Sequence, residues 1–154
     1  MSHRDGAQGA ERPLDPVLDF MRLLWSIEHG LQRKSKKMEG ELGITGPQRL
    51  VLRVVSRFPG ISASELAHVV RLHPSTITGV LQRLVGKGWI ERRRDPTDTR
   101  RVQLLLKPSA VTFTRTTRGT VERAVTDALD HVGDANVRAA RKVLAEIVNR
   151  LSDL

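Results

Sequence analysis

Apolar residues recur every three or four positions over most of the chain, which is the spacing of one face of an α-helix. The first such stripe runs from Pro16 to about Met38. Gly40 and Gly43 then interrupt it. A second helix is predicted to begin after Thr45, whose hydroxyl suits a helix N-cap. The positions expected to face inward on this second helix are Leu50, Val51, Val54 and Val55.

Two short helices are predicted in the middle of the chain. The segment Ser62–Glu65 has the spacing of a capping box, so a helix should run from Ala63 to about Val70. Pro74 is expected in the first turn of the next helix, which ends at Gly86. The positions expected to face inward are Leu66, Val69 and Val70 on the first helix and Ile77, Val80, Leu81, Leu84 and Val85 on the second.

A β-hairpin and two further helices complete the pattern. The extended runs Trp89–Arg93 and Arg101–Leu106 flank a turn at Asp95–Asp98, which predicts a hairpin. A long helix is expected from Pro108 to Val132, and a last one over Val137–Leu151. The predicted fold class is therefore mainly α with a small β-hairpin wing. This order of elements is that of a winged helix-turn-helix flanked by helices at both chain ends.

The second short helix is the candidate for recognition of a DNA major groove. Gln82 and Arg83 are long enough to contact base edges, although short hydroxyls near a helix start are also common caps. Gly79 lowers helix propensity by about 1 kcal/mol relative to Ala. Close approach of the backbone to DNA, or to a neighbouring helix, would explain that glycine. The residues expected on the exposed side are Pro74, Ser75, Thr76, Thr78, Gly79, Gln82 and Arg83.

The hairpin is unusually rich in arginine and is predicted to contact phosphates. Its arginines are Arg92, Arg93, Arg94, Arg100 and Arg101. We expect Asp98 to hold the guanidinium of Arg100 by a charge-assisted hydrogen bond, which would fix its direction. The alternative is an ordinary Asx turn with a free arginine.

Composition supports a polyanionic partner and excludes several classes of site. The 154-residue chain carries 26 Lys and Arg against 17 Asp and Glu, a net charge of +9. Such an excess favours phosphate contacts, or only keeps the protein soluble. The absence of cysteine excludes disulfides and thiolate metal sites and fits a cytoplasmic location. Residues 1–13 are polar, lack the apolar run of a signal peptide and are expected to form a disordered tail; no apolar run is long enough to span a membrane.

Residues 45–108 resemble the MarR family of bacterial and archaeal regulators. The resemblance rests on the capping-box helix at 62–67, the run 73–81 and the wing 94–102, in which Asp98-Thr99-Arg100 is the most specific motif. It departs from the family at 107–110, where Lys-Pro-Ser-Ala replaces the usual Thr-Pro-x-Gly. The resemblance implies that Ser75, Thr76, Thr78 and Arg83 face the major groove and that Arg100 enters the minor groove, supported by Asp98.

The resemblance also implies a division of the chain and an oligomeric state. A dimerisation helix would occupy 14–44, the DNA-binding domain 45–107 and further dimerisation helices 108–154. The protein is thus predicted to be a homodimeric repressor on a pseudo-palindromic operator with half-sites about 10 bp apart. Two alternatives are a winged-helix module that binds an acidic protein and an architectural protein that binds DNA without regard to sequence.

Many members of the family respond to small aromatic acids, so the resemblance raises the question of an effector. Trp25, His29 and Arg33 lie on one helical face and are candidates for a ligand pocket, although core and surface roles explain the same residues. The five histidines have no metal-ligand spacing, so no metal or other cofactor is expected. Neither a phosphate-binding glycine loop nor a nucleophile motif is present, so no enzymatic activity is predicted.

Overall fold

The computed structural model describes residues 13–152, so the predicted N-terminal tail lies almost entirely outside the described residues. The first helix, α1 (Pro16–Leu42), begins at Asp15, whose carboxylate accepts hydrogen bonds from the backbone N–H groups of Val17 and Leu18. The prediction that this helix stops near Met38 is wrong. Gly40 stays helical, and the helix ends only at Gly43, where a φ of 70° provides the left-handed C-cap.

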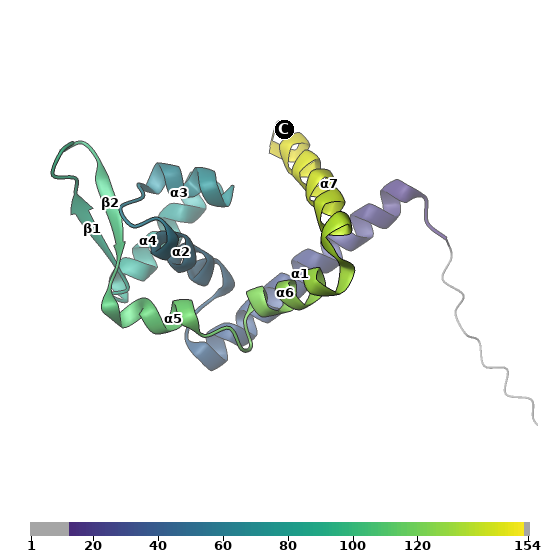
Figure 1. Cartoon of the computed structure of the whole chain (residues 1–154), viewed down its shortest axis with the longest axis horizontal. Coiled ribbons are helices and arrows are strands. Elements are labelled where there is room, and N and C mark those ends of the chain that lie inside the picture. The colour runs from purple at the N-terminus through teal and green to yellow at the C-terminus, as the bar shows by residue number, and fades with distance from the viewer. Residues whose placement is uncertain (1–12, 153–154) are drawn as a thin grey trace, which may run out of the picture.

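Four helices and a hairpin form a compact unit, which we call the winged lobe (Figure 1). It consists of α2 (Gly46–Arg57), α3 (Ala63–Val70), α4 (Pro74–Gly86), β1 (Ile90–Arg94), β2 (Val102–Leu106) and the short α5 (Val111–Arg115). The strands are antiparallel, with Ile90 opposite Leu106 and Arg94 opposite Val102. The fold class predicted from the sequence is confirmed, and each strand begins one residue later than expected.

Local side-chain hydrogen bonds explain where two of these helices begin. Thr45 and Gln48 form a capping box at the start of α2, and Ser62 and Glu65 form another at the start of α3. Both helix starts were predicted at these residues. A capping box satisfies two backbone N–H groups that a helix start would otherwise leave without partners.

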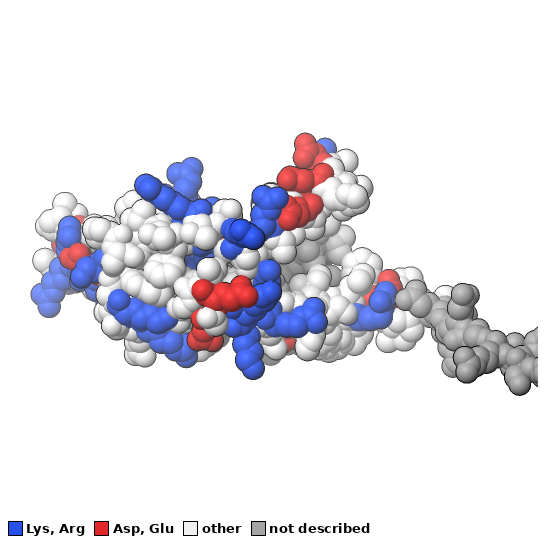
Figure 2. Space-filling view, turned by 90° about the horizontal axis from the view of Figure 1, so that it is seen from below, with Lys and Arg blue, Asp and Glu red and all other residues white. Residues whose placement is uncertain are grey.

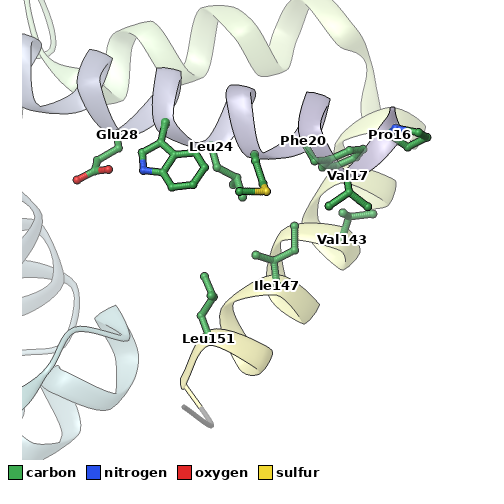
Figure 3. A pocket seen from close by; sticks show the side chains of 10 residues that line it. Pro16, Val17, Phe20, Leu24, Glu28, Val143, Ile147 and Leu151 are labelled. Atoms are coloured by element: carbon green, nitrogen blue, oxygen red, sulfur yellow. The ribbon is translucent and has the colours of Figure 1, made fainter. Parts of the chain in front are cut away.

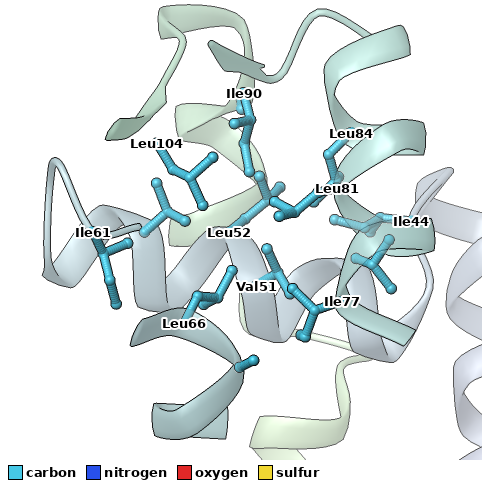
Figure 4. Packing of buried hydrophobic residues seen from close by; sticks show 14 residues of the cluster. Ile44, Val51, Leu52, Ile61, Leu66, Ile77, Leu81, Leu84, Ile90 and Leu104 are labelled. Atoms are coloured by element: carbon cyan, nitrogen blue, oxygen red, sulfur yellow. The ribbon is translucent and has the colours of Figure 1, made fainter. Parts of the chain in front are cut away.

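The core of the winged lobe lies between α2, α3, α4 and the hairpin (Figure 4). Val51 and Leu52 of α2 are fully buried, and Ile90 and Leu104 close the core from the hairpin side. Three residues predicted to face inward are instead exposed, at 44% for Leu50, 50% for Val69 and 38% for Val85. Periodicity limits the buried face of a helix only to within about one residue on either side.

The predicted long helix from Pro108 to Val132 is in fact broken. A short 3₁₀ turn, η1 (Pro108–Ala110), leads into α5, and α6 (Val121–Val132) begins only after Thr120 caps it. Gly119 lies between them in the left-handed region, with a φ of 77°. Phe113 of α5 packs on Trp89, which precedes β1, with ring centroids 4.2 Å apart, and so holds α5 against the rest of the winged lobe.

The last two helices form a separate arm. α7 (Asp134–Ser152) follows α6 after Gly133, and we call these two helices the arm. α6 lies along α1, while α7 projects away from it (Figure 1). Within residues 13–152, no helix is long and apolar enough to cross a membrane, and no group of three or more His, Asp or Glu residues could hold a metal ion.

Candidate nucleic-acid interface

One face of α4 is buried and the opposite face is exposed, as the sequence predicted. Ile77, Val80, Leu81 and Leu84 are buried in the core. The opposite side presents polar residues to solvent. Of the predicted contact residues, Gly79 is half-buried and the others are exposed, namely Pro74, Ser75, Thr76, Thr78, Gln82 and Arg83.

The start of α4 is fixed by a histidine rather than by a hydroxyl. His73 is the N-cap, and its Nδ1 accepts a hydrogen bond from the backbone N–H of Ser75 at 3.2 Å. The Ser75 hydroxyl lies 2.7 Å from the same nitrogen. The Thr78 hydroxyl donates to the carbonyl oxygen of Pro74 at 2.9 Å. Both hydroxyls are therefore oriented by the helix itself and retain oxygen lone pairs toward solvent.

Gly79 lies in the middle of α4 where the protein does not require a glycine. A Cβ atom built at this position would meet no atom within 4 Å among the described residues. Packing against a neighbouring helix of this chain is therefore excluded as the reason for the glycine. The other explanation offered by the sequence, close approach of DNA to the helix backbone, stays a prediction.

The structure separates the five wing arginines into two groups. Arg93 forms an ion pair with Glu91 at 3.1 Å, and Arg101 forms one with Glu65 at 2.9 Å. The other three guanidinium groups make no hydrogen bond or ion pair within the described part of the chain, and they belong to Arg92, Arg94 and Arg100. These three are therefore the wing cations available for phosphate.

The predicted contact between Asp98 and the Arg100 guanidinium is not formed. Oδ1 of Asp98 instead accepts a hydrogen bond from the backbone N–H of Arg100 at 3.0 Å. The alternative Asx turn is therefore the arrangement found. Asp98 shapes the backbone at the tip of the wing and leaves the side chain of Arg100 free.

Asp95 is the principal polar residue that organises the wing, and the sequence analysis did not assign it a role beyond the turn. Its Oδ1 accepts hydrogen bonds from the N–H and the hydroxyl of Thr97, at 2.8 and 2.7 Å. Its Oδ2 accepts one from the Gln103 side chain at 2.9 Å. The bonds from Thr97, followed by that from Gln103, lower the pKa of Asp95 to about 2. Aspartate followed two residues later by threonine is a sequence signal for such a turn.

Arg101, at the end of the turn that joins the two strands, ties the wing to the start of α3. Its guanidinium contacts both carboxylate oxygens of Glu65, the residue that closes the α3 capping box. Hydrogen bonds from Ser62 are the main cause that lowers the pKa of Glu65, and the charge of Arg101 adds to them. Arg101, predicted to bind DNA, is thus already engaged in a contact that orients the wing against the helix pair.

Basic side chains are scattered over the winged lobe, its wing end included, and over its junction with the arm (Figure 2). Acidic side chains are interspersed on the same view, over the middle and on the arm. The basic side chains on this face therefore do not form a single uninterrupted patch.

The N-terminal half of α1 and the arm expose many apolar side chains. Between α1 and α7 these side chains line a groove with a volume of about 780 Å³. Val17 and Leu24 of α1 face Val143, Ile147 and Leu151 of α7 across it (Figure 3). Among the described residues that line this groove, Glu28 is the one with a charged side chain, and Val17 is 68% and Leu151 64% exposed in the single chain.

The three candidate ligand residues of α1 do not meet in one pocket. Trp25 lines the groove between α1 and α7. Arg33 lines a different and smaller one between α1 and α6. His29 is exposed and lines neither. Their helical spacing places them on one face of α1, but different parts of α1 lie beside α7 and beside α6.

Comparison with known proteins finds a family model that matches the winged lobe. Residues 44–102 match the model of the MarR family. These residues run from the start of α2 into the hairpin and include all of α3 and α4.

Two curated relatives carry the same kind of domain. The chain is 32% identical over 93 residues to the HTH-type transcriptional regulator TtmR of Methylorubrum extorquens, which covers 60% of this chain and 47% of the relative. It is also 32% identical over 92 residues to the multiple antibiotic resistance protein MarR of Salmonella typhimurium, covering 60% and 64%. The chain thus spans about half to two thirds of the length of the curated relatives it matches.

A solved structure extends the likeness beyond the winged lobe. The S. aureus MepR–DNA complex matches with a TM-score of 0.71 and 20% identity, over 86% of this chain and 97% of that one. At this identity the likeness establishes the fold. It covers the terminal helices as well as the winged lobe.

Proposed function

We propose that the chain is a member of the MarR family and a DNA-binding transcription regulator that acts as a homodimer. The family consists of regulators rather than enzymes, in agreement with the sequence prediction. One observation carries the proposal: α4 buries its apolar side and turns a polar side, with Gln82 and Arg83, to solvent beside a wing that holds three free arginines.

The wing and α4 suit two different kinds of DNA contact. Arg83 and Gln82 have the length and the donor groups to contact base edges in the major groove. Arg92, Arg94 and Arg100 carry their charge on the hairpin, where it suits phosphates or a narrow minor groove. Gly79 allows the backbone of α4 to approach DNA closely, because no part of the described chain occupies the space beside it.

The homodimer is supported by the exposed apolar surface of the terminal helices. Contiguous exposed apolar patches of this kind mark interaction surfaces. We assign the partner of this surface as a second copy of the chain, whose two-fold symmetry would place two α4 helices on a pseudo-palindromic site. Exposed apolar side chains of this surface include Val17, Phe20, Trp25, Ile27, Leu129, Val132, Leu144 and Leu151.

Repression, location in the cytoplasm and response to a small aromatic acid remain proposals that rest on the family resemblance. The effector has no assigned pocket, since Trp25 and Arg33 line different grooves and His29 lines neither. If an effector acts, it would release DNA by binding better to a spacing of the two α4 helices that does not fit the operator.

The test is selection of binding sites from a pool of random duplexes, followed by footprinting and a salt series. A pseudo-palindrome with half-sites about 10 bp apart, bound with a steep salt dependence, is the expected result. Sedimentation velocity on the same sample should show a dimer, and Ile147→Glu in the groove should give a monomer. Asn136→Glu, at an exposed polar position of the same helix, is the matched control.

Two outcomes would favour the alternatives. Equal affinity for every duplex would indicate an architectural protein. Absence of duplex binding at low salt would indicate a module that binds a protein, with the basic surface meeting an acidic partner.

A further inference from the structure

An ion pair between a buried arginine and a half-buried glutamate connects the winged lobe to the arm. Arg49 of α2 has a side chain that is only 2% exposed, and its Nε lies 2.6 Å from Oε2 of Glu122 in α6. Its Nη1 donates a hydrogen bond to the carbonyl oxygen of Phe113 in α5. One guanidinium therefore contacts the helices before and after the break that separates α5 from α6.

The groups around this ion pair leave Glu122 as the partner that neutralises Arg49. Arg53, one turn further along α2, donates to the carbonyl oxygen of Thr114 at 2.8 Å, and its Nε lies 3.9 Å from Glu122. Nη2 of Arg49 is buried and has no hydrogen-bond partner among the described residues. Glu122 is thus the carboxylate that neutralises Arg49, and a buried guanidinium without it would be strongly unfavourable.

Glu122 lies where a small rotation has a large effect. It is in the first turn of α6, directly after the buried N-cap Thr120, and a Cβ on Gly46 of α2 would lie 3.7 Å from Val121. The start of α6 therefore abuts α2, and the main packing contacts of the rest of the arm are with α1 and within the arm itself. A second, exposed contact with the winged lobe is the hydrogen bond from Nη1 of Arg71, which follows α3, to Oδ1 of Asn149 in α7 at 2.9 Å. At about 1.5 Å per residue, a rotation of roughly 10° at this end moves the far end of α6 by about 3 Å.

We propose that Arg49 and Glu122 form the joint that sets the direction of the arm relative to the winged lobe. In the homodimer proposed above, on which this inference rests, the arm belongs to the dimer surface. The joint therefore sets the distance between the two α4 helices. Arg49 and Glu122 are positioning residues, because they act on DNA only through the placement of α4.

If the ion pair only stabilised the fold, removing it would leave the direction of the arm unchanged. Replacing a buried ion pair with uncharged side chains of similar volume often leaves stability unchanged or raises it. The double variant R49M/E122Q should then remain folded, and any loss of positioning would appear without a loss of stability. E122A, which leaves the guanidinium buried without its carboxylate, is the harsher variant. D127N is the matched control, since Asp127 pairs with Arg123 within α6 and does not reach α2.

The first readout is the distance between the winged lobe and the arm. The chain has no cysteine, so Ser56→Cys on α2 and Asp130→Cys on α6 introduce the only two sites for spin labels. Double electron–electron resonance is measured on full chains mixed with an excess of unlabelled chain. A single narrow distance is expected for the unaltered joint and for D127N, and a broader or shifted one for E122A and R49M/E122Q.

The second readout is the preference for half-site spacing on the selected operator. Inserting or deleting one base pair moves the half-sites by about 3.4 Å. The wild type and D127N are expected to discriminate against the altered spacings by about tenfold or more, the range of typical coupling energies. R49M/E122Q should bind the native spacing less tightly and discriminate by less than about threefold.

The outcomes separate the joint from the proposed function. A folded R49M/E122Q with the wild-type label distance and spacing preference would overturn the joint. If the wild type selects no operator, the proposed function fails, and the label distances still decide whether the pair directs the arm. R49K keeps the positive charge at this position but removes the fork-shaped guanidinium. A narrow label distance in R49K would show that the geometry of the guanidinium is unnecessary, and would overturn the claim that its contacts direct the arm.

Discussion

Arg101, directly before β2, contacts the carboxylate of Glu65 with Nη2 at 3.2 Å from Oε1 and 2.9 Å from Oε2. The same carboxylate accepts the backbone N–H of Ser62 and so closes the capping box of α3. A single acidic side chain therefore orients the wing and begins the helix that precedes α4. The neighbouring Arg100 has no such partner, which makes the two adjacent arginines separable by mutation.

Arg100→Ala and Arg101→Ala should differ in how they change DNA binding. Loss of Arg100 should reduce the salt dependence of binding by about one unit of slope, because one phosphate contact disappears. Loss of Arg101 should instead loosen the wing and reduce the affinity for DNA by less than the loss of Arg100. This difference from the wild type should disappear at high salt, which screens the ion pair with Glu65. Fluorescence anisotropy across a salt series measures both. Equal slopes for Arg100→Ala and the wild type would remove Arg100 from the phosphate contacts.

Arg83→Ala should relax the preference for one base pair of the operator. If Arg83 contacts a base edge, discrimination at that position should fall by roughly 1–3 kcal/mol while other positions keep theirs. Competition binding against operators altered at single positions gives these values. A uniform loss over all sequences would make Arg83 a phosphate contact.

Gly79→Ala should stabilise the protein and weaken its binding to DNA. The added methyl group meets no atom within 4 Å in the described residues, and alanine favours an exposed helix by up to about 1 kcal/mol. Urea unfolding and anisotropy on the same sample test the two effects. Unchanged affinity would mean that the backbone of α4 does not approach DNA closely at this position.

His73→Ala should lower the free energy of unfolding by about 1 kcal/mol, the usual effect of removing an N-cap. His73→Asn is the control, because asparagine also accepts a hydrogen bond from the helix start. Urea unfolding of both variants provides the comparison. A loss in the asparagine variant as large as that in the alanine variant would indicate that the ring contributes by packing rather than by capping.

Asp95 should make the stability of the wing depend on acid. Its pKa is lowered from 3.8 to about 2 in the folded chain, so the carboxylate stabilises the fold above pH 3.8 and this contribution is lost as the pH falls through about 2. Urea unfolding between pH 4 and pH 2, at about equal ionic strength, should show a shallower pH dependence for Asp95→Asn than for the wild type. Identical slopes would contradict the role of Asp95.

Contacts within a few residues were predictable from the sequence. The caps at Thr45 and Ser62, the first turn of α4 at Pro74 and the polar face with Arg83 all depend on side chains one to four positions apart. At this range the helix geometry itself fixes which groups can meet. The hairpin and the order of the elements follow in the same way from local turn signals.

Tertiary structure decided which charged side chains are free of ion pairs and where the predicted long helix is broken. Glu65 and Arg101 are 36 residues apart, and Arg49 and Glu122 are 73 apart, so no local spacing indicates that either pair forms. Periodicity also predicted Leu50 as buried and joined α5 to α6. A hydrophobic stripe fixes a face only approximately, and the direction in which that face is covered depends on elements distant in sequence.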